Sequence, residues 1–274
     1  MAYHQEELEE YGMRITLGDV CQSYDSFEVL KNISFTAEAG EVLALLGPNG
    51  CGKSTLIKTI CNVKPAISGS VHINGTDITE IKKKDLAKLI AYVPQSNIHS
   101  VFSTVYDTVL VGRRPYMEWS YTRNDLKIAA EAMMAMRVDD LADRYVNELS
   151  GGQMQRVFIA RALTQDPGFY LFDEPTSSLD LRNQLDTMRI MNEIVKKRGS
   201  GMIVALHDLN LALRYSDKVL VMKDKGIYAF GRPEDVITEQ TIYDVYDVDA
   251  EIVEGKHGKY IQPYDCSDTG LCLS

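Results

Sequence analysis

The chain has 274 residues, of which 45% are hydrophobic and 25% are charged, so it is long enough for one large or two small domains with a sizeable core. Lys and Arg total 29 against 39 Asp and Glu, and the net charge of −10 argues against a broad nucleic-acid-binding face. The sequence contains no apolar run near the roughly 20 residues of a membrane span, and its first ten residues are acidic, unlike a signal peptide. We therefore expect a cytoplasmic chain, unless a partner holds it at a membrane.

Short apolar strands and tight turns are predicted from Met13 to about Val93, with one helix among them. A glycine-rich loop follows the apolar run 41–46 and precedes a helix, and it matches the phosphate-binding pattern Gly-x-x-x-x-Gly-Lys-Ser. Its residues are Gly47, Pro48, Asn49, Gly50, Cys51, Gly52, Lys53, Ser54 and Thr55. Backbone N–H groups of such a loop curl around a phosphate chain, the lysine neutralises charge, and the serine offers Mg²⁺ an oxygen. The loop predicts binding of ATP with Mg²⁺.

The cysteines lack the paired spacing of a zinc site and are expected to be reduced thiols. They are Cys21, Cys51, Cys61, Cys266 and Cys272. Cys51 fills a small space in the phosphate loop, or its oxidation blocks nucleotide binding; the sequence favours the first reading.

A helical insert is predicted from residue 97 to about 165, where apolar residues recur at helical spacing. The insert contains Leu126 among these apolar positions, and its methionines, Met133, Met134 and Met136, are expected to fill the core. Gln95 ends the strand before the insert, and its amide is placed to contact Mg²⁺ or water while its loop moves the insert; an ordinary loop residue is the alternative. Three consecutive lysines, 82–84, are interpreted as a solvated helix end, with an anion site as the alternative.

A second anion-binding segment closes the insert. Ser150, Gly151, Gly152 and Gln153 begin a helix with a capping box, and the two glycines expose N–H groups at the positive end of the helix dipole. One ATP does not need two separate anion sites, so the second is expected to serve a nucleotide bound to another copy of the chain. This predicts a dimer with ATP at the seam.

Two later strands, expected at 168–172 and 201–206, end in residues suited to chemistry. Asp173 is predicted to hold Mg²⁺ and Glu174 to orient an attacking water, rather than to form a solvated acidic turn. His207 ends the second strand as a γ-phosphate sensor, with a structural histidine as the alternative.

Two further residues carry open alternatives. Asp180 either carries information across the dimer seam or caps a helix, and Tyr24 either stacks on adenine or belongs to the core or a sheet edge. Near the carboxyl end we expect one capped helix from 232 to about 245, and a strand pair around the turn 255–258.

Together these motifs resemble the ATPase subunit of ABC transporters over nearly the whole chain. The matching positions are Tyr24, Gly47 to Thr55, Gln95, Leu149 to Gln153, Tyr170 to Glu174, Ser178 to Asp180, and His207. The resemblance implies that Tyr24 stacks on adenine, that 47–55 bind phosphates, and that Gln95 contacts Mg²⁺ and couples to the insert. It further implies that 149–153 bind the γ-phosphate of the partner's ATP and that 170–174 supply an Mg²⁺ ligand and the catalytic base. Residues 178–180 would form the loop at the dimer seam, and His207 would be the switch histidine. Cys51, the acidic start and the cysteine-bearing tail depart from the family pattern without removing a catalytic group.

The resemblance implies an α/β fold: a P-loop NTPase (RecA-like) core with an amino-terminal antiparallel β subdomain and an inserted α-helical subdomain. The predicted parts are an acidic extension (1–12), the first part of the core (13–96), the helical subdomain (97–165), the second part of the core (166–225) and a carboxyl-terminal extension (226–274). It also implies a homodimer at the cytoplasmic face of the membrane, peripheral to two transmembrane permease subunits that dock around Gln95 to Arg114, and indirectly an extracytoplasmic substrate-binding protein. No nucleic-acid partner is expected.

Segments 101–115, 173–180 and 207–217 look like the branch that imports iron–siderophore, haem or cobalamin complexes. The rivals are an importer of another metal or an oxyanion, and a soluble ABC ATPase that assists cofactor assembly. An ABC ATPase of DNA repair or of ribosomes fits less well, because no coiled coil separates Lys53 from Ser150 and the charge is acidic.

Overall fold

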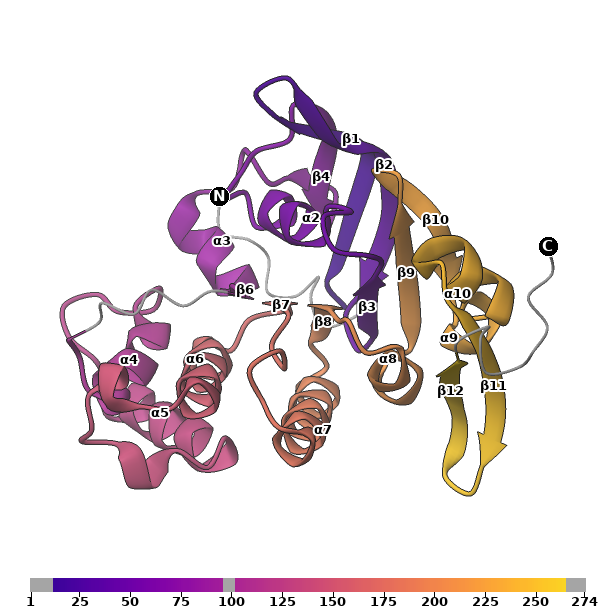
Figure 1. The fold of residues 1–274 in the computed structure, drawn as a ribbon. Helices are drawn as coiled ribbons and strands as arrows, with labels where there is room; N and C mark the ends of the chain where they lie inside the picture. Colours follow the sequence, from indigo (N-terminus) through magenta and orange to yellow (C-terminus); the bar gives the residue numbers. More distant parts are fainter. Residues whose placement is uncertain (1–11, 96–101, 265–274) are drawn as a thin grey trace, which may run out of the picture.

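The computed structural model describes residues 12–95 and 102–264, and its helices and strands carry the labels of Figure 1. Its amino-terminal part contains a four-stranded antiparallel sheet in the order β2–β1–β4–β5. These strands are β1 (Arg14–Tyr24), β2 (Phe27–Glu38), β4 (Ser68–Ile73) and β5 (Thr76–Asp77). Buried and more exposed side chains largely alternate along β1, as they do in a strand with one face on the core.

A six-stranded sheet in the order β10–β9–β3–β8–β7–β6 forms the centre, and only its edge strand β10 runs antiparallel to its neighbour. Its strands are β3 (Val42–Leu46), β6 (Ile90–Val93), β7 (Phe169–Asp173), β8 (Gly201–Ala205), β9 (Lys218–Lys223) and β10 (Gly226–Gly231). Every residue of β3, β7 and β8 is buried, because parallel strands are covered on both faces. These uniformly apolar runs were predicted as strands, and the prediction is confirmed.

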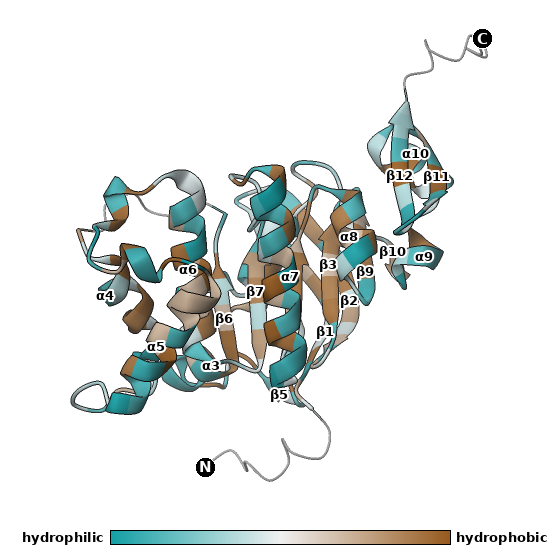
Figure 2. Cartoon of the chain, turned by 90° about the horizontal axis from the view of Figure 1, so that it is seen from below, coloured by the Kyte–Doolittle hydropathy of each residue, from teal (hydrophilic) through white to brown (hydrophobic). Residues whose placement is uncertain are grey.

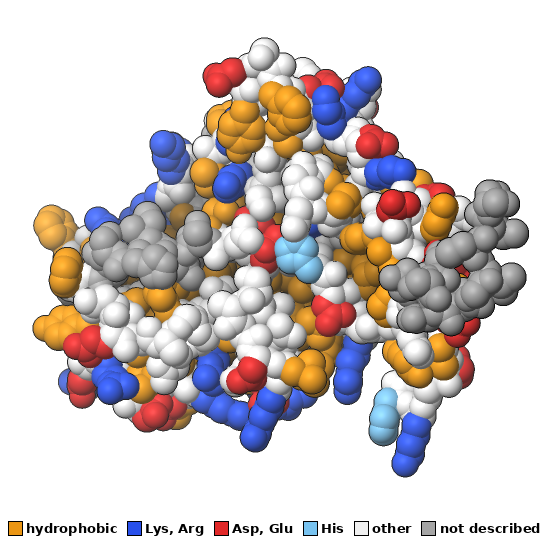
Figure 3. All heavy atoms as spheres, in the orientation of Figure 1, with side chains coloured by type: hydrophobic (Ala, Val, Ile, Leu, Met, Phe, Trp, Pro, Cys, Tyr) orange, Lys and Arg blue, Asp and Glu red, His pale blue; other side chains and the backbone are white. Residues whose placement is uncertain are grey.

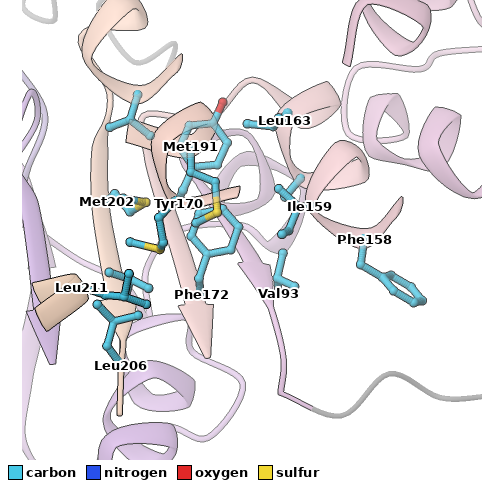
Figure 4. Packing of buried hydrophobic residues seen from close by; sticks show 14 of the residues in the cluster. Val93, Phe158, Ile159, Leu163, Tyr170, Phe172, Met191, Met202, Leu206 and Leu211 are labelled. Carbon is cyan, nitrogen blue, oxygen red and sulfur yellow. The ribbon is translucent and has the colours of Figure 1, made fainter. Parts of the chain in front are cut away.

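Helices complete the layers on both sides of this sheet. Leu56, Ile57 and Ile60 of α2 (Lys53–Ile60) share one apolar cluster with residues of both sheets. On the opposite face lie α6 (Gly151–Gln165), α7 (Leu181–Arg198) and α8 (Leu209–Tyr215), and Figure 2 shows the polar side of α7 turned away from the strands. Tyr170 and Phe172 of β7 stack there with ring centroids 6.1 Å apart, next to side chains of α6 and α7 (Figure 4). The remaining helix of this region is α3 (Lys83–Leu89).

The described part of the predicted insert, residues 102–165, is helical, as expected (Figure 1). Its elements are α4 (Val105–Leu110), η2 (Val111–Arg113), α5 (Arg123–Ala135), η3 (Asp139–Leu141), η4 (Val146–Glu148) and α6 (Gly151–Gln165). A buried ion pair of 2.8 Å between Arg113 and Asp125 ties η2 to α5.

One methionine of α5 is placed differently from the prediction. Met133 and Met136 are 2% and 1% exposed and fill the core as expected, but Met134 is 56% exposed. Successive residues of a helix are turned by about 100°, which carries Met134 off the buried face that Met133 occupies. Leu126, near the start of the helix, is 39% exposed.

The carboxyl-terminal part after β10 contains two helices where one was predicted. They are α9 (Pro233–Val236) and α10 (Glu239–Tyr246), followed by the hairpin of β11 (Asp249–Gly255) and β12 (Gly258–Tyr264). The chain breaks at Ile237, which is buried, and at Thr238, which is extended. The Thr238 hydroxyl then accepts the N–H of Thr241 at 3.1 Å and starts the second helix, so a cap overrides the continuous pattern. The strand pair around 255–258 is confirmed.

The predicted fold class is confirmed: an α/β core with an antiparallel β subdomain and a helical subdomain. The boundaries between the parts stay a prediction. The acidic stretch 1–11, the first residues of the insert (96–101), Cys266 and Cys272 lie outside the described residues. Within residues 12–95 and 102–264, no helix is long and apolar enough to cross a bilayer.

Candidate nucleotide-binding and hydrolysis site

The phosphate loop connects the end of β3 to the start of α2. Gly47 opens it with φ 140°, and a Cβ there would lie 2.4 Å from the carbonyl oxygen of Met222 on β9. Gly52 has φ 108° and occupies the N-cap of α2 without a side-chain cap. The loop therefore needs glycine at both places, and it leaves the first N–H groups of α2 available to an anion.

Two side chains at the start of α2 point to a phosphate and metal site. The buried ammonium of Lys53 donates to the carbonyl oxygens of Gly47 at 2.7 Å and Pro48 at 3.2 Å. The hydroxyl of Ser54 donates to a carboxylate oxygen of Asp173 at 2.8 Å, across 119 positions of sequence. Burial is the main cause that raises the pKa of Asp173, and the neighbouring Glu174 adds to it. A cation bound beside this carboxylate would favour its charged form.

The donor set at Ser54 and Asp173 fits Mg²⁺. Mg²⁺ prefers oxygen ligands, keeps several waters and is bound through one or two carboxylates plus substrate phosphates. In the described ranges no group of three or more His, Cys, Asp and Glu side chains is placed to hold a metal ion, so a protein-only cage is absent from this part of the chain. One hydroxyl and one carboxylate, completed by phosphate oxygens and water, match the Mg²⁺ chemistry.

Glu174 lies at the centre of a second set of contacts. One of its carboxylate oxygens is 2.5 Å from Nε2 of His207, and the other accepts a short hydrogen bond from the amide of Gln95. Its backbone has φ 53°, a left-handed conformation that costs a non-glycine residue energy. The tips of β6, β7 and β8 thus bring together three residues that are far apart in the sequence.

These groups line a cavity of about 550 Å³ at the carboxyl ends of the parallel strands. Its lining consists of Val29, Asn49, Gly50, Gly52, Lys53, Ser54, Thr55, Gln95, Glu174, Ser177 and His207. In the space-filling view, a histidine and acidic side chains meet near the middle of the face shown (Figure 3). Val29 and Ser177 were not predicted as site residues: a valine in a strand carries no chemical signal, and Ser177 lies within the segment 173–180 but was given no role of its own.

Known proteins are similar to this chain over most of its length. A family model described as ABC transporter matches residues 30–177. The chain belongs to the ABC transporter family. An uncharacterized ABC transporter ATP-binding protein of Methanocaldococcus jannaschii is 45% identical over 88% of this chain and 94% of its own. A probable siderophore transport system ATP-binding protein of Bacillus subtilis is 36% identical over 84% and 85%. A solved inward-facing structure of a putative metal-chelate type ABC transporter aligns with a TM-score of 0.80 at 24% identity, covering 93% of this chain and 99% of that one, and shows the shared fold.

The predicted second anion-binding segment of this ABC transporter subunit is not part of the lining of the phosphate-loop cavity. Ser150 and Gln153 form the predicted capping box: the Ser150 hydroxyl accepts the N–H of Gln153, and the Gln153 side chain accepts the N–H of Ser150 at 3.0 Å. Gly151 and Gly152 begin α6, beside Ser178 and Leu179. None of the four lines the phosphate-loop cavity of its own chain.

The contacts of Asp180 and Tyr24 help to choose between the two roles that the sequence left open for each. Asp180 caps α7, where its carboxylate accepts the N–H of Asn183 at 2.8 Å, so the helix-cap reading is borne out and a seam role stays a prediction. Tyr24 is 45% exposed at the end of β1, which excludes the core reading, and it is not part of the cavity lining. The ammonium of Lys64 lies 2.9 Å from the centre of its ring, a contact that the sequence did not indicate.

Cys51 is buried inside the phosphate loop. Burial raises the pKa of its thiol and outweighs the opposing charge of Lys53. A protonated, buried thiol is a poor nucleophile, which supports the space-filling reading.

Proposed function

We propose that this chain is the ATP-hydrolysing subunit of an ABC importer that takes up an iron complex, either a siderophore or haem, or cobalamin. The observation that carries the hydrolytic part is the meeting of Lys53, the Ser54–Asp173 pair and the Glu174–His207 pair around one cavity. Lys53 and the N–H groups of α2 bind the phosphates, and Glu174 orients the attacking water and accepts its proton. His207 and Gln95 hold the Glu174 carboxylate and are placed to respond to the γ-phosphate. Mg²⁺ held by Ser54 and Asp173 would neutralise charge on the phosphate oxygens.

Two copies form the working ATPase in this proposal. The start of α6 offers N–H groups and a helix dipole to an anion, yet none of its residues lines the cavity of its own chain. A second copy, turned to face the first, brings its Ser150–Gln153 segment over the nucleotide. Such a site is complete only in the dimer, and Asp180 and Tyr24 are proposed to contact the seam and the adenine, respectively.

We expect Ser150→Asp to abolish the ATP-dependent dimer while leaving the subunit folded. Aspartate caps a helix as well as serine does, but its charge would repel the γ-phosphate of the partner's ATP. The mass of the complex with ATP, measured by light scattering on the hydrolysis-deficient Glu174→Gln protein, tests this. Thr238→Asp makes the same change at the N-cap of α10 and should dimerise normally. A stable dimer of the Ser150→Asp protein would contradict the proposed seam.

A groove of about 570 Å³ between α3, η2 and α6 is the proposed docking site of the permease. Its lining contains Lys83, Lys84, Arg114 and Arg161, and no carboxylate is present among the described residues that line it. Burial lowers the pKa of Arg161, as expected for a desolvated cation. On a chain of net charge −10, this local positive groove suits an acidic cytoplasmic helix of a membrane subunit.

Reversing this charge should release the membrane partner. We expect tagged Glu174→Gln protein with ATP to recover a multi-span permease and a substrate-binding lipoprotein from its native membranes. The added changes Lys83→Glu and Lys84→Glu should reduce the recovered permease about tenfold or more, by mass spectrometry, because several charge pairs are lost. Lys256→Glu with Lys259→Glu, on the exposed β11–β12 turn, is the matched control. Recovery of soluble partners only would favour the cofactor-assembly alternative.

The iron-complex cargo is supported by relatives. Besides the probable siderophore system, proteins named for petrobactin import in Bacillus subtilis and achromobactin transport in Dickeya dadantii match 85% and 87% of this chain at 32% and 36% identity. The cargo follows from the lipoprotein recovered in the same experiment, whose affinity for ferric siderophores, haem and cobalamin can be measured directly. A lipoprotein specific for an oxyanion or another metal would overturn this part of the proposal.

A further inference from the structure

The ring of Tyr24 is contacted by a lysine from another segment of the chain. The ammonium of Lys64 lies 2.9 Å from the centre of the ring and donates a hydrogen bond to the carbonyl oxygen of Ser23 at 2.7 Å. Lys64 follows α2, and its own N–H donates to the carbonyl of Lys58 in the last turn of that helix at 3.2 Å. The contact therefore joins the end of β1 to the end of α2.

Hydrogen bonds fix the backbone around Lys64 to β1. The side-chain amide of Gln22, which is fully buried, donates to the carbonyl oxygens of Lys64 at 3.3 Å and Pro65 at 2.7 Å. The N–H of Ile67 donates to the carbonyl oxygen of Cys21 at 3.0 Å. The lysine side chain thus starts from a fixed place, which keeps its ammonium close to the ring.

The ring itself lies in a place where few contacts restrict it. Tyr24 is the last residue of β1 and is 45% exposed, and its partner across the hairpin, Phe27, is 65% exposed. Exposed side chains exchange rapidly between staggered χ1 rotamers. A cation is attracted to the negative face of an aromatic ring, so the ammonium of Lys64 favours one rotamer of Tyr24. It covers one face, and the exposed fraction shows that the ring remains accessible elsewhere.

The same hairpin reaches the phosphate-loop cavity. Val29 of β2 lines this cavity, and a Cβ on Gly52 of the loop would lie 3.1 Å from the Val29 carbonyl oxygen. Phe27 lies two residues before Val29, so both side chains share one face of β2, about 7 Å apart along the strand. Tyr24 is paired with Phe27 and lies on the same face. A row of apolar side chains therefore leads from the cavity wall to the contact with Lys64.

We propose that Lys64 is a positioning residue for the nucleotide base, whose ammonium holds the ring of Tyr24 so that a purine stacks on the ring's other face. The inference rests on the proposed binding of ATP and on the proposed contact of Tyr24 with adenine. A base that meets an ordered ring loses less free energy to fixing the side chain. The phosphates contact other groups, so Lys64 should act only on ligands that carry a base.

The test compares Lys64→Met with Lys64→Arg in the full chain. Methionine keeps an unbranched apolar stem and removes the charge, whereas arginine keeps a cation that can lie on the ring. If the ring then samples its three χ1 rotamers equally, the competent fraction falls to about a third. The dissociation constant of MgADP, measured by calorimetric titration, should then rise about threefold in Lys64→Met. Lys64→Arg should keep the affinity of the unaltered protein.

Two further readouts separate positioning from a general effect on the site. The affinity for magnesium tripolyphosphate, which has no base, should be the same in Lys64→Met and in the unaltered protein. In the Tyr24→Leu background, Lys64→Met should no longer change the affinity for MgADP, because the ring through which it acts is absent. Lys88→Met is the matched control: its ammonium lies 5.9 Å from the centre of the Tyr116 ring, and its loss should leave MgADP binding unchanged.

The contrary outcomes are distinct. Unchanged or tighter MgADP binding by Lys64→Met would overturn the inference, and tighter binding would mean that the ammonium occupies the face that the base needs. Equal losses in the Met and Arg variants, an equal loss of tripolyphosphate affinity, or an effect that persists without the Tyr24 ring would overturn it as well. In all these cases the proposed function stands. If the unaltered protein does not bind MgADP, the proposed function fails and the inference with it.

Discussion

Replacing Glu174 with glutamine is expected to lower the rate of ATP hydrolysis about a hundredfold or more, the usual contribution of a positioned general base. The amide keeps the size of the side chain and occupies the same place between His207 and Gln95, but it cannot accept a proton from water. ATP should still bind, because Lys53 and the glycine loop are untouched. The protein should therefore accumulate as an ATP-bound dimer. Steady-state phosphate release and light scattering measure the two effects.

Glu131→Gln provides the matched control for this change. Glu131 lies on the solvent side of α5 and has only a weak ion pair of 3.8 Å with Lys127. Its replacement should leave hydrolysis within twofold, because exposed pairs of this kind contribute little. Normal turnover by the Glu174→Gln protein would defeat the assignment of Glu174 as the base.

Alanine in place of Gly47 should lower the free energy of unfolding by about 2–5 kcal/mol, combining backbone strain with overpacking. The added Cβ would lie 2.4 Å from the Met222 carbonyl oxygen and 2.8 Å from the Cys51 sulfur, at a backbone φ of 140°. The peptide oxygen of β9 cannot move away without breaking its strand. Denaturant unfolding gives the loss of stability, and MgADP titration should show weaker binding because the distorted loop no longer fits the phosphates.

Gly75→Ala separates the two causes. Gly75 also has a positive φ, of 82°, but a Cβ there meets nothing within 4 Å. Its replacement should cost only the conformational strain, about 1–2 kcal/mol. If both variants lose the same stability, the contact between Gly47 and β9 is not the restraint inferred here.

Much of the site could be predicted because its chemistry is local in the sequence. Lys53 and Ser54 follow a glycine pattern that needs a strand before it and a helix after it, and the structure has both. Asp173 ends the strand β7, Glu174 follows it and His207 follows β8, and parallel strands place their carboxyl ends at one edge. The meeting of Glu174 and His207 at one cavity therefore follows from strand order, although the Ser54–Asp173 bond depends on the tertiary fold.

The remainder depends on contacts between distant segments. The contact of Lys64 with the ring of Tyr24 could not be predicted from a sequence pattern, and neither could the place of Val29 in the cavity wall. Both depend on how β1, β2 and α2 pack. The break between α9 and α10 was not predicted because the helical spacing of apolar residues continues across Ile237. The chain nevertheless starts a new helix at the N-cap Thr238.

Because the Ser150–Gln153 segment does not line the phosphate-loop cavity of its own chain, the proposed dimer has a consequence for how ATPase activity depends on protein concentration. If each nucleotide site needs the phosphate loop of one copy and the Ser150–Gln153 segment of another, free subunits must first associate in a second-order reaction. The specific ATPase activity of dilute protein then rises with its concentration. Two copies bound to one membrane complex instead share a small volume, and their effective concentration no longer depends on how many subunits the cell makes. The membrane partner would then set the basal turnover simply by tethering, before any cargo arrives.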